Sequence, residues 1–118
     1  IKASQIFIFS EFVGVDWSES KRQKMSEFKN FNDFFTRELN DGARPLDPDP
    51  KALLSPADGK VSQCGRITGE RLLQAKGRHF TLGALLGNDP AARHFQDGFF
   101  HTIYLSPRDY HRVHMPIC

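Results

Sequence analysis

Residues 106–116 (SPRDYHRVHMP) bring together side chains that could carry acid–base chemistry. The segment holds His111 and His114, two arginines, an aspartate and a tyrosine. Histidine titrates near neutral pH and is the commonest general acid or base in enzymes. Histidines three positions apart point to opposite sides of a strand, whereas they can share a side in a turn. The pattern alone leaves a catalytic and a structural role for this pair equally open.

A second candidate is Asp58, in the predicted tight turn of residues 55–59 (SPADG). An aspartate before a glycine usually bonds the backbone of its own turn, so composition alone favours a structural role. Lys76 could meet a phosphate or a carboxylate, although a solvated strand end is the simpler interpretation. No further cluster of histidine or cysteine has the spacing of metal ligands, so no metal site is predicted.

We call residues 106–116 the histidine segment. Apolar periodicity predicts a helix well before this segment in the sequence. Asn30 can cap this helix, and its apolar stripe consists of Phe31, Phe34, Phe35 and Leu39. A following Asp-Gly pair would end it, because glycine tolerates the left-handed conformation of a helix end. The helix and the residues before it form the predicted helical part of the chain.

A proline-rich connector, residues 44–50 (RPLDPDP), separates this helix from a β-rich remainder. Short apolar runs between glycines predict strands at residues 61–67, 71–75 and 99–105, helical turns at 81–86 and 89–90, a turn at 106–109, and a strand or extended loop at 110–115. The predicted fold class is therefore α+β, with a first domain of residues 1–43 and a second of residues 44–118.

Composition narrows the function classes. The 118 residues are 25% charged and 39% hydrophobic, which is typical of one globular domain. The net charge is only +2 and no basic stripe occurs, so nucleic-acid binding is not predicted. Cys64 and Cys118 form no Cys-x-x-Cys pair, and this sparse cysteine content favours a reducing compartment.

Residues 6–15 (IFIFSEFVGV) are apolar but too short to span a bilayer. A core helix or strand is the favoured interpretation, because aromatic side chains pack in cores far more often than they anchor membranes. The alternative is a segment in the membrane interface, anchored by aromatic side chains, namely Phe7, Phe9, Phe12 and Trp17. Both ends of the chain are interpreted as cut, because it starts at Ile1 and stops just after Pro116 in a predicted strand.

Several motifs then line up with one family. The chain resembles phosphatidylserine decarboxylases over about residues 28–118, through FNDFFTREL followed by Arg-Pro, SPADG, LLQAKG and YLSPRDYHRVHMP. The last motif is long and specific. The resemblance implies a β-rich barrel or sandwich, here truncated in mid-domain, preceded by N-terminal helices that touch the membrane. It therefore places the interfacial interpretation of residues 6–15 on a level with the core interpretation.

The resemblance also implies roles for individual residues. In that family a proenzyme cuts itself at a Gly-Ser bond, and the serine becomes a pyruvoyl group. Asp58 and His114 would be two members of an Asp-His-Ser triad, with His114 as the base and Asp58 orienting it. His111 would assist the conversion of phosphatidylserine to phosphatidylethanolamine and CO2, as a proton donor. Arg112 and Lys76 would contact the substrate.

The chain contains no Gly-Ser dipeptide. The resemblance therefore implies that the serine lies beyond residue 118, on the pyruvoyl-bearing small chain of the same proenzyme. We expect residues 1–118 to be inactive by themselves. The implied location is the cytoplasmic face of a bacterial inner membrane, as a peripheral protein, because a phospholipid head group must reach the site. The resemblance leaves a homodimer open.

Two other function classes are alternatives to this family assignment. In the first, the chain is a non-catalytic binding module in which Arg108, Arg112 and Lys76 hold an anionic phospholipid head group. In the second, it is a Ser-His-Asp hydrolase, which is disfavoured because no Gly-x-Ser-x-Gly motif is present.

Overall fold

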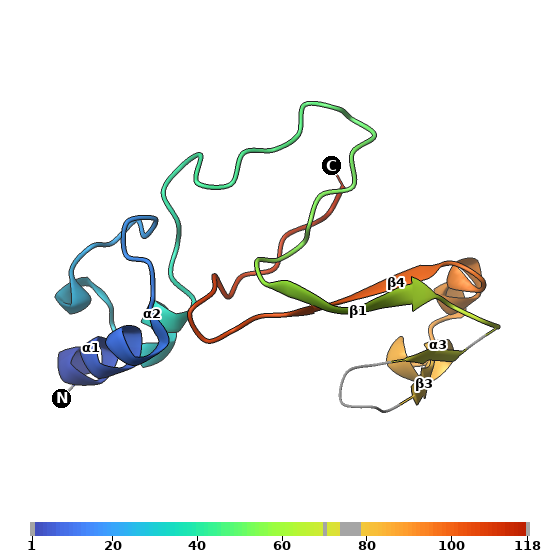
Figure 1. The fold of residues 1–118 in the computed structure, drawn as a ribbon, viewed down its shortest axis with the longest axis horizontal. Helices are drawn as coiled ribbons and strands as arrows, with labels where there is room; N and C mark the ends of the chain where they lie inside the picture. Colours follow the sequence, from blue (N-terminus) through green and yellow to red (C-terminus); the bar gives the residue numbers. More distant parts are fainter. Residues whose placement is uncertain (1, 70, 74–78, 118) are drawn as a thin grey trace. The chain divides into compact units, whose positions relative to one another are not determined.

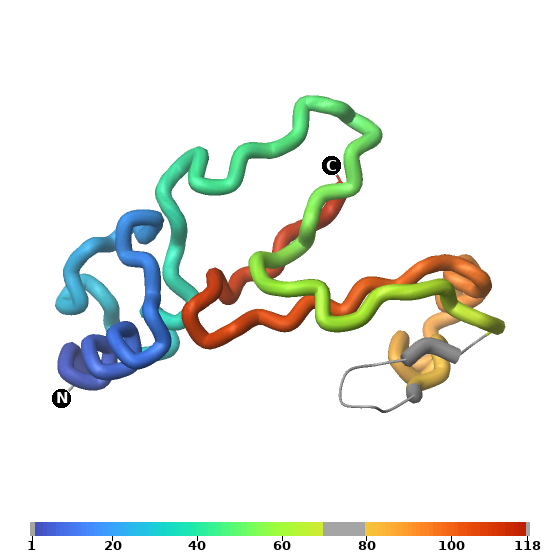
Figure 2. The backbone as a smooth tube through the Cα atoms, viewed as in Figure 1, coloured from blue at the N-terminus to red at the C-terminus, as the bar shows by residue number. Residues whose placement is uncertain are grey.

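The computed structural model describes residues 2–69, 71–73 and 79–117 (Figure 1). It contains α1 (Lys2–Val13), the 3-10 helix η1 (Met25–Glu27), α2 (Phe31–Phe35), β1 (Lys60–Arg66), β2 (Arg71–Leu73), β3 (His79–Thr81), α3 (Leu82–Leu85), the 3-10 helix η3 (Pro90–Phe95) and β4 (Phe99–Tyr104). Two compact units form, residues 1–59 with 105–118 and residues 60–104, and the chain path of each can be followed in Figure 2. The α+β class is confirmed.

Aromatic packing holds the first unit together. Its buried apolar residues are Ile6, Val15, Phe28 and Phe34. Phe28 and Phe34 meet edge to face, with ring centroids 5.6 Å apart, and Trp17 stacks on Phe34 at 5.4 Å. Aromatic side chains bury large apolar areas, so this cluster explains how α1 and the short α2 are held on one core.

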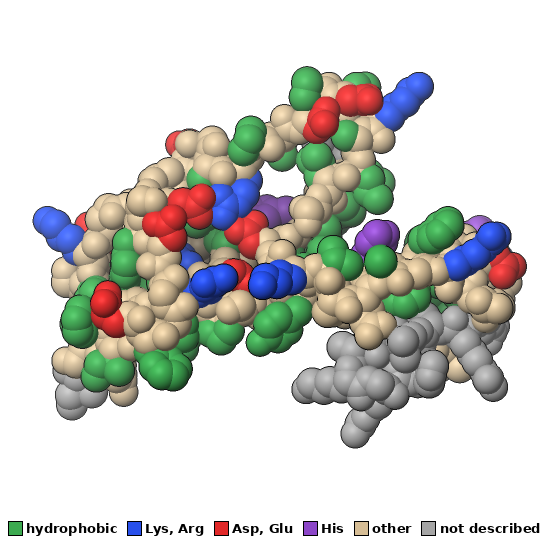
Figure 3. Space-filling view, in the orientation of Figure 1, with side chains coloured by type: hydrophobic (Ala, Val, Ile, Leu, Met, Phe, Trp, Pro, Cys, Tyr) green, Lys and Arg blue, Asp and Glu red, His purple; other side chains and the backbone are tan. Residues whose placement is uncertain are grey.

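Helix α1 has a buried side and an exposed apolar side. Ile6 and Ser10 are buried, and the exposed fractions of Phe7, Ile8 and Phe12 are 51%, 67% and 88%. Figure 3 shows apolar side chains gathered over α1. A core helix is therefore present, and two of the four proposed membrane anchors, Phe9 and Trp17, pack against the core. No helix among the described residues has the length and apolar character to cross a membrane.

Helix α2 begins where it was predicted and ends earlier. The Asn30 side chain accepts a hydrogen bond from the backbone N–H of Asp33 at 2.9 Å, which confirms the cap. The helix stops at Phe35, because the following chain pairs with residues 19–21, including an isolated bridge between Ser20 and Leu39. The prediction that Leu39 belongs to the helical stripe was wrong, since this long-range pairing outweighs the local periodicity.

The second unit contains two antiparallel strand pairs, β1 with β4 and β2 with β3. The β1–β4 register runs from Lys60 opposite Tyr104 to Arg66 opposite Phe99, with an irregularity after Val61. Predicted strands 61–67 and 99–105 match β1 and β4 to within one residue. Asp89 caps η3, as predicted, by accepting from the N–H of Ala91 at 2.8 Å.

A closed barrel or sandwich is not confirmed. The described strands form separate two-stranded sheets, and neither sheet closes. Closing a sheet into a barrel requires more strands, staggered in register, than these pairs provide. The predicted division assigned residues 1–43 to a helical segment and residues 44–118 to a β-rich catalytic domain, and it stays a prediction. The two compact units of the structure have different boundaries from this division, because residues 105–118 pack with residues 1–59.

Candidate functional site

Two segments far apart in sequence, residues 54–58 and 114–116, run side by side in the first unit (Figure 2). Their backbones exchange hydrogen bonds of 2.9 and 2.8 Å, the shorter running from the N–H of His114 to the carbonyl of Pro56. This pairing brings the SPADG turn and the second histidine onto one cavity of about 550 Å³. Asp58 and His114 both line that cavity, as do Arg44 and Tyr110.

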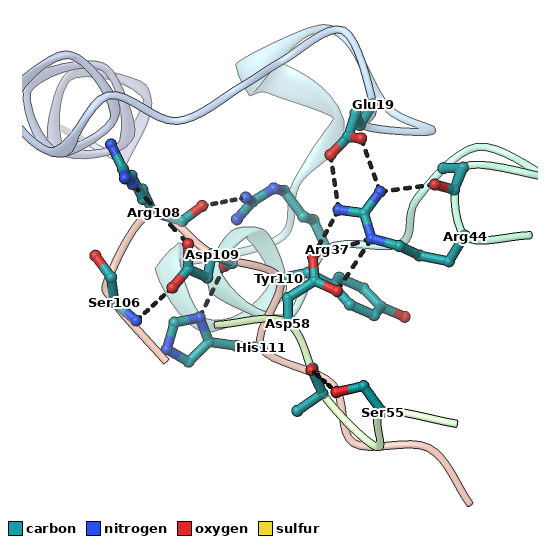
Figure 4. A network of polar contacts seen from close by, with 12 residues as sticks. Glu19, Arg37, Arg44, Ser55, Asp58, Ser106, Arg108, Asp109, Tyr110 and His111 are labelled. Carbon is teal, nitrogen blue, oxygen red and sulfur yellow. Dashed lines mark hydrogen bonds and ion pairs between the residues drawn. The ribbon is translucent and has the colours of Figure 1, made fainter. Parts of the chain in front are cut away.

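The Asp58 carboxylate is bound by Arg44 (Figure 4). Nε of Arg44 lies 3.0 and 3.1 Å from the two Asp58 oxygens. The other end of the guanidinium donates to both oxygens of Glu19, at 2.7 and 2.9 Å. Asp58 is therefore held by a distant arginine, and not by the backbone of its own turn as composition suggested.

These contacts shift the pKa values of Arg44 and Glu19. Hydrogen bonds to Glu19 and then to Asp58 raise the pKa of Arg44 above its ordinary value. The hydrogen bond from Arg44 holds the pKa of Glu19 below its ordinary value. Arg44 is thus a permanent cation between two carboxylates, one of which lines the cavity.

His114 is held by Tyr110. Nε2 of His114 lies 2.9 Å from the Tyr110 hydroxyl, and the two rings stack with an interplanar angle of 16°. Tyr110 is buried whereas His114 is exposed, so the tyrosine is the fixed member of the pair. Among the described contacts, Asp58 and His114 share the cavity but form no direct hydrogen bond with each other.

His111 has different neighbours from His114. Its Nδ1 lies 2.9 Å from the carbonyl of Asp109, and a carbonyl can only accept, so Nδ1 carries a proton. The imidazole packs on Phe35 with ring centroids 4.0 Å apart. Neutral His111 therefore presents Nε2 as its proton acceptor. It does not line the cavity shared by Asp58 and His114.

The predicted substrate contacts are only partly placed. Arg112 donates from Nε to the carbonyl of Thr36 at 2.9 Å, and its Nη1 lies 3.4 Å from Oε1 of Glu38. These two contacts tie the Arg112 side chain to the segment after α2. The side chain of Arg108 is 56% exposed. Lys76 lies outside the described residues.

Arg37 ties the histidine segment to the end of α2. It is 3% exposed and donates from Nη2 to the carbonyl of Arg108 at 2.8 Å. Burial lowers its pKa. Its Nε and Nη1 have no hydrogen-bond partner in the part of the chain that the structure describes.

Sequence reasoning assigned no role to Glu19, Arg44 or the hydroxyl of Tyr110. Arg44 lies 14 and 25 positions from its two partners, so no local spacing indicates these contacts. The Tyr110–His114 pair is four positions apart, and this spacing within the histidine segment is the one signal that could have indicated it. Within the described ranges, no three His, Cys, Asp or Glu side chains gather in a way that could hold a metal ion.

Comparisons with known proteins agree on one family. The family model described as phosphatidylserine decarboxylase matches residues 31–118. The chain is 49% identical over 116 residues to the phosphatidylserine decarboxylase proenzyme of Acinetobacter baumannii (strain SDF), covering 98% of this chain and 41% of that protein. Identity to the proenzyme of Pseudomonas fluorescens is 56% over 110 residues, covering 92% and 38%. Identity to that of Pasteurella multocida is 54% over 112 residues, covering 94% and 38%. The chain thus spans about 40% of the length of these relatives.

Proposed function

Because the chain belongs to the phosphatidylserine decarboxylase family, we propose that it supplies the Asp and the His of a self-processing site in a longer proenzyme. The observation that carries this proposal is the pairing of residues 54–58 with residues 114–116, since it puts Asp58 and His114 on one cavity. A carboxylate and an imidazole are the two groups that activate the serine hydroxyl in an Asp-His-Ser triad, and here they lie on one cavity.

In this proposal the serine comes from a part of the protein outside these 118 residues. His114 accepts the hydroxyl proton, and the freed oxygen attacks the carbonyl carbon of the preceding residue. The peptide bond breaks, an ester forms in its place, and the freed amine takes the proton from the His114 imidazolium. Asp58 stabilises the imidazolium that His114 becomes during this step. Elimination of the ester then releases the upstream chain as a carboxylate and leaves dehydroalanine, which water hydrolyses to the pyruvoyl group and ammonia. The cavity of about 550 Å³ is large enough to admit such a segment.

The residues present also fit a pyruvoyl group made from that serine, because the cavity joins a carboxylate and an imidazole with open space beside them. Such a group supplies the carbonyl that acts as the electron sink in decarboxylation. His111 is the residue proposed to move a proton during turnover. Its Nδ1 is occupied by the Asp109 carbonyl, so Nε2 is the atom that can hold the proton and deliver it to substrate carbon.

Phosphatidylserine is the proposed substrate, and the proposed location is the cytoplasmic face of a bacterial inner membrane. The exposed apolar side chains of Phe7, Ile8 and Phe12 support an interfacial position for α1. Peripheral attachment of this kind would bring a phospholipid head group to the protein without a membrane-spanning helix. Arg112 and Lys76 remain the proposed contacts for the anionic head group.

Mass spectrometry of the full-length gene product tests this function. We expect two chains, one of which carries a pyruvoyl-blocked terminus. His114→Ala and Asp58→Ala should leave the precursor uncut, because each removes one member of the triad. His101→Ala and Asp47→Ala are matched controls, since both residues are exposed and lie off the cavity. Normal cleavage of His114→Ala would contradict the proposal.

A further inference from the structure

We propose that Arg44 is a positioning residue for self-cleavage: it holds the Asp58 carboxylate in place, and Glu19 in turn fixes Arg44. The proposal rests on the function proposed above, because it gives Arg44 a role only through Asp58. We call Glu19, Arg44 and Asp58 the carboxylate clamp (Figure 4).

Every N–H of the Arg44 guanidinium has an acceptor. Nε donates to Asp58, Nη2 donates to Asp58 and to Glu19, and Nη1 donates to Glu19 and to the carbonyl of Ala43. An arginine has five such groups in a rigid plane, so full occupancy leaves the side chain a single orientation. An arginine whose donors are all used is suited to hold a neighbouring group, and not to capture a ligand.

The clamp leaves part of the hydrogen-bond acceptor capacity of the Asp58 carboxylate free. A carboxylate offers about four lone-pair sites, and Arg44 approaches from one side. Asp58 therefore keeps acceptor capacity on the cavity that it shares with His114. Fixing the carboxylate in advance lowers the ordering cost when the imidazole of His114 needs a partner.

Glu19 matters for the charge of the clamp. An Asp58–Arg44 pair alone would be neutral, and a neutral pair gives weak support to an imidazolium. With Glu19 the clamp holds two carboxylates against one guanidinium, so its formal charge is −1. The clamp thus orients Asp58 and still leaves the negative charge that stabilises protonated His114.

The Arg22–Asp33 pair shows what a purely structural counterpart looks like. It is also doubly bonded, with both Nη–Oδ distances at 2.8 Å. Asp33 lies on α2, and neither residue lines the cavity of Asp58 and His114. Replacing Arg22 therefore removes an equivalent ion pair from the same unit without touching Asp58, which makes it the matched control.

The test measures the rate at which full-length precursor converts to two chains, by denaturing gel and mass spectrometry. We expect Arg44→Ala to slow conversion at least about tenfold, which corresponds to about 1.4 kcal/mol of barrier. Arg44→Lys should recover only part of the rate, because an ammonium cannot form the planar fork. The conversion rate of Glu19→Gln should lie between the rates of Arg44→Ala and the wild type. Arg22→Ala should cleave within about twofold of the wild-type rate, a difference of under 0.5 kcal/mol.

Chemical rescue separates positioning from a general loss of structure. Guanidinium at a non-denaturing concentration should speed conversion of Arg44→Ala and leave Arg22→Ala unchanged. Circular dichroism of each precursor before cleavage confirms that the compared samples are folded. Wild-type-like conversion of Arg44→Ala, or equal slowing of Arg22→Ala with no rescue of either variant, overturns the role of Arg44. Failure of the wild-type protein to cleave would instead overturn the proposed function.

Discussion

The hydroxyl of Tyr110 is a polar group on a buried side chain, and Nε2 of His114 is its hydrogen-bond partner. Buried hydroxyls are destabilising when they lack a partner, so this bond contributes to folding as well as to the orientation of His114. The neighbouring His111 is oriented differently, through the Asp109 carbonyl. The two histidines are thus oriented by different partners, His114 by a side-chain hydroxyl and His111 by a backbone carbonyl.

Tyr110→Phe should lower the free energy of unfolding by about 1 kcal/mol, because it removes one hydrogen bond and keeps the stacked ring. It should also slow self-cleavage of the full-length protein, since His114 loses its orienting contact. Denaturant titration and a cleavage time course measure the two effects. Tyr104→Phe is the control, because Tyr104 is 59% exposed and lies in the other unit. Unchanged stability and cleavage in Tyr110→Phe would refute the assigned contact.

The Arg22–Asp33 pair predicts a pH dependence of stability. Hydrogen bonds from Arg22 and from the N–H of Lys29 hold the pKa of Asp33 well below its usual range. A depressed carboxyl pKa stabilises the fold fully above the ordinary aspartate value of about 4, and this stabilisation is lost as pH falls through the folded-state pKa. Asp33→Asn should therefore reduce stability at neutral pH and flatten its decline in acid. Thermal melts across pH, with Asp41→Asn as the exposed control, measure this, and an unaltered acid slope would count against it.

Among the helices and strands, α1 contributes a side chain to the core and also carries exposed apolar side chains. Ile6 anchors the helix in the aromatic core, and Ser10 turns its hydroxyl back to the carbonyl of Phe7 at 3.0 Å. The buried side therefore fixes the helix, while Phe12 and Ile8 remain exposed. The exposed side chains can therefore be replaced without disturbing the packing of the helix, which makes the proposed membrane contact testable.

Replacing both Ile8 and Phe12 with serine should weaken binding of the protein to vesicles of phosphatidylserine and phosphatidylcholine, because the exposed apolar area is removed. Stability should change little, since neither side chain is in the core. Vesicle co-sedimentation measures the binding. Leu53→Ser combined with Val113→Ser is the matched control, with exposed fractions of 77% and 74% in the same unit and off the cavity. Equal loss of binding in both double variants would argue against a specific role for α1.

At the scale of the whole molecule, the two units have unequal cores. The first unit buries Ile6, Val15, Phe28 and Phe34 together, whereas the described core of the second is the pair Ile67 and Leu82. Two-stranded sheets are marginally stable in water unless further strands or helices cover them. The stability of the 118-residue chain should therefore be concentrated in its first unit.

Hydrogen exchange should show this difference. Backbone amides of β1 and β4 should exchange faster than those of α1 in the isolated 118-residue chain, because local opening costs less where little apolar area is buried. Mass spectrometry of peptides after timed exchange gives the comparison. Uniform protection across both units would show that the second unit does not depend on further packing.

The isolated 118-residue chain is also expected to release no CO2 from phosphatidylserine by itself.

Much of the fold could be predicted from short-range patterns. The Asn30 cap, the Asp89 cap and the strands β1 and β4 follow from residues within a few positions of each other, and the structure confirms them. The end of α2 could not be predicted in this way. Leu39 continues the helical stripe in sequence, but it pairs with Ser20, and no periodicity reports that contact.

Motifs of specific residue types were enough to identify the family and to single out Asp58, His111 and His114 as candidates. Only the folded chain shows which groups hold these side chains: Arg44 with Glu19 for Asp58, Asp109 for His111 and Tyr110 for His114. Turns, caps and strands can be predicted because they depend on neighbours in sequence. The clamp around Asp58 depends instead on where folding brings side chains that are 14 and 25 positions away from Arg44.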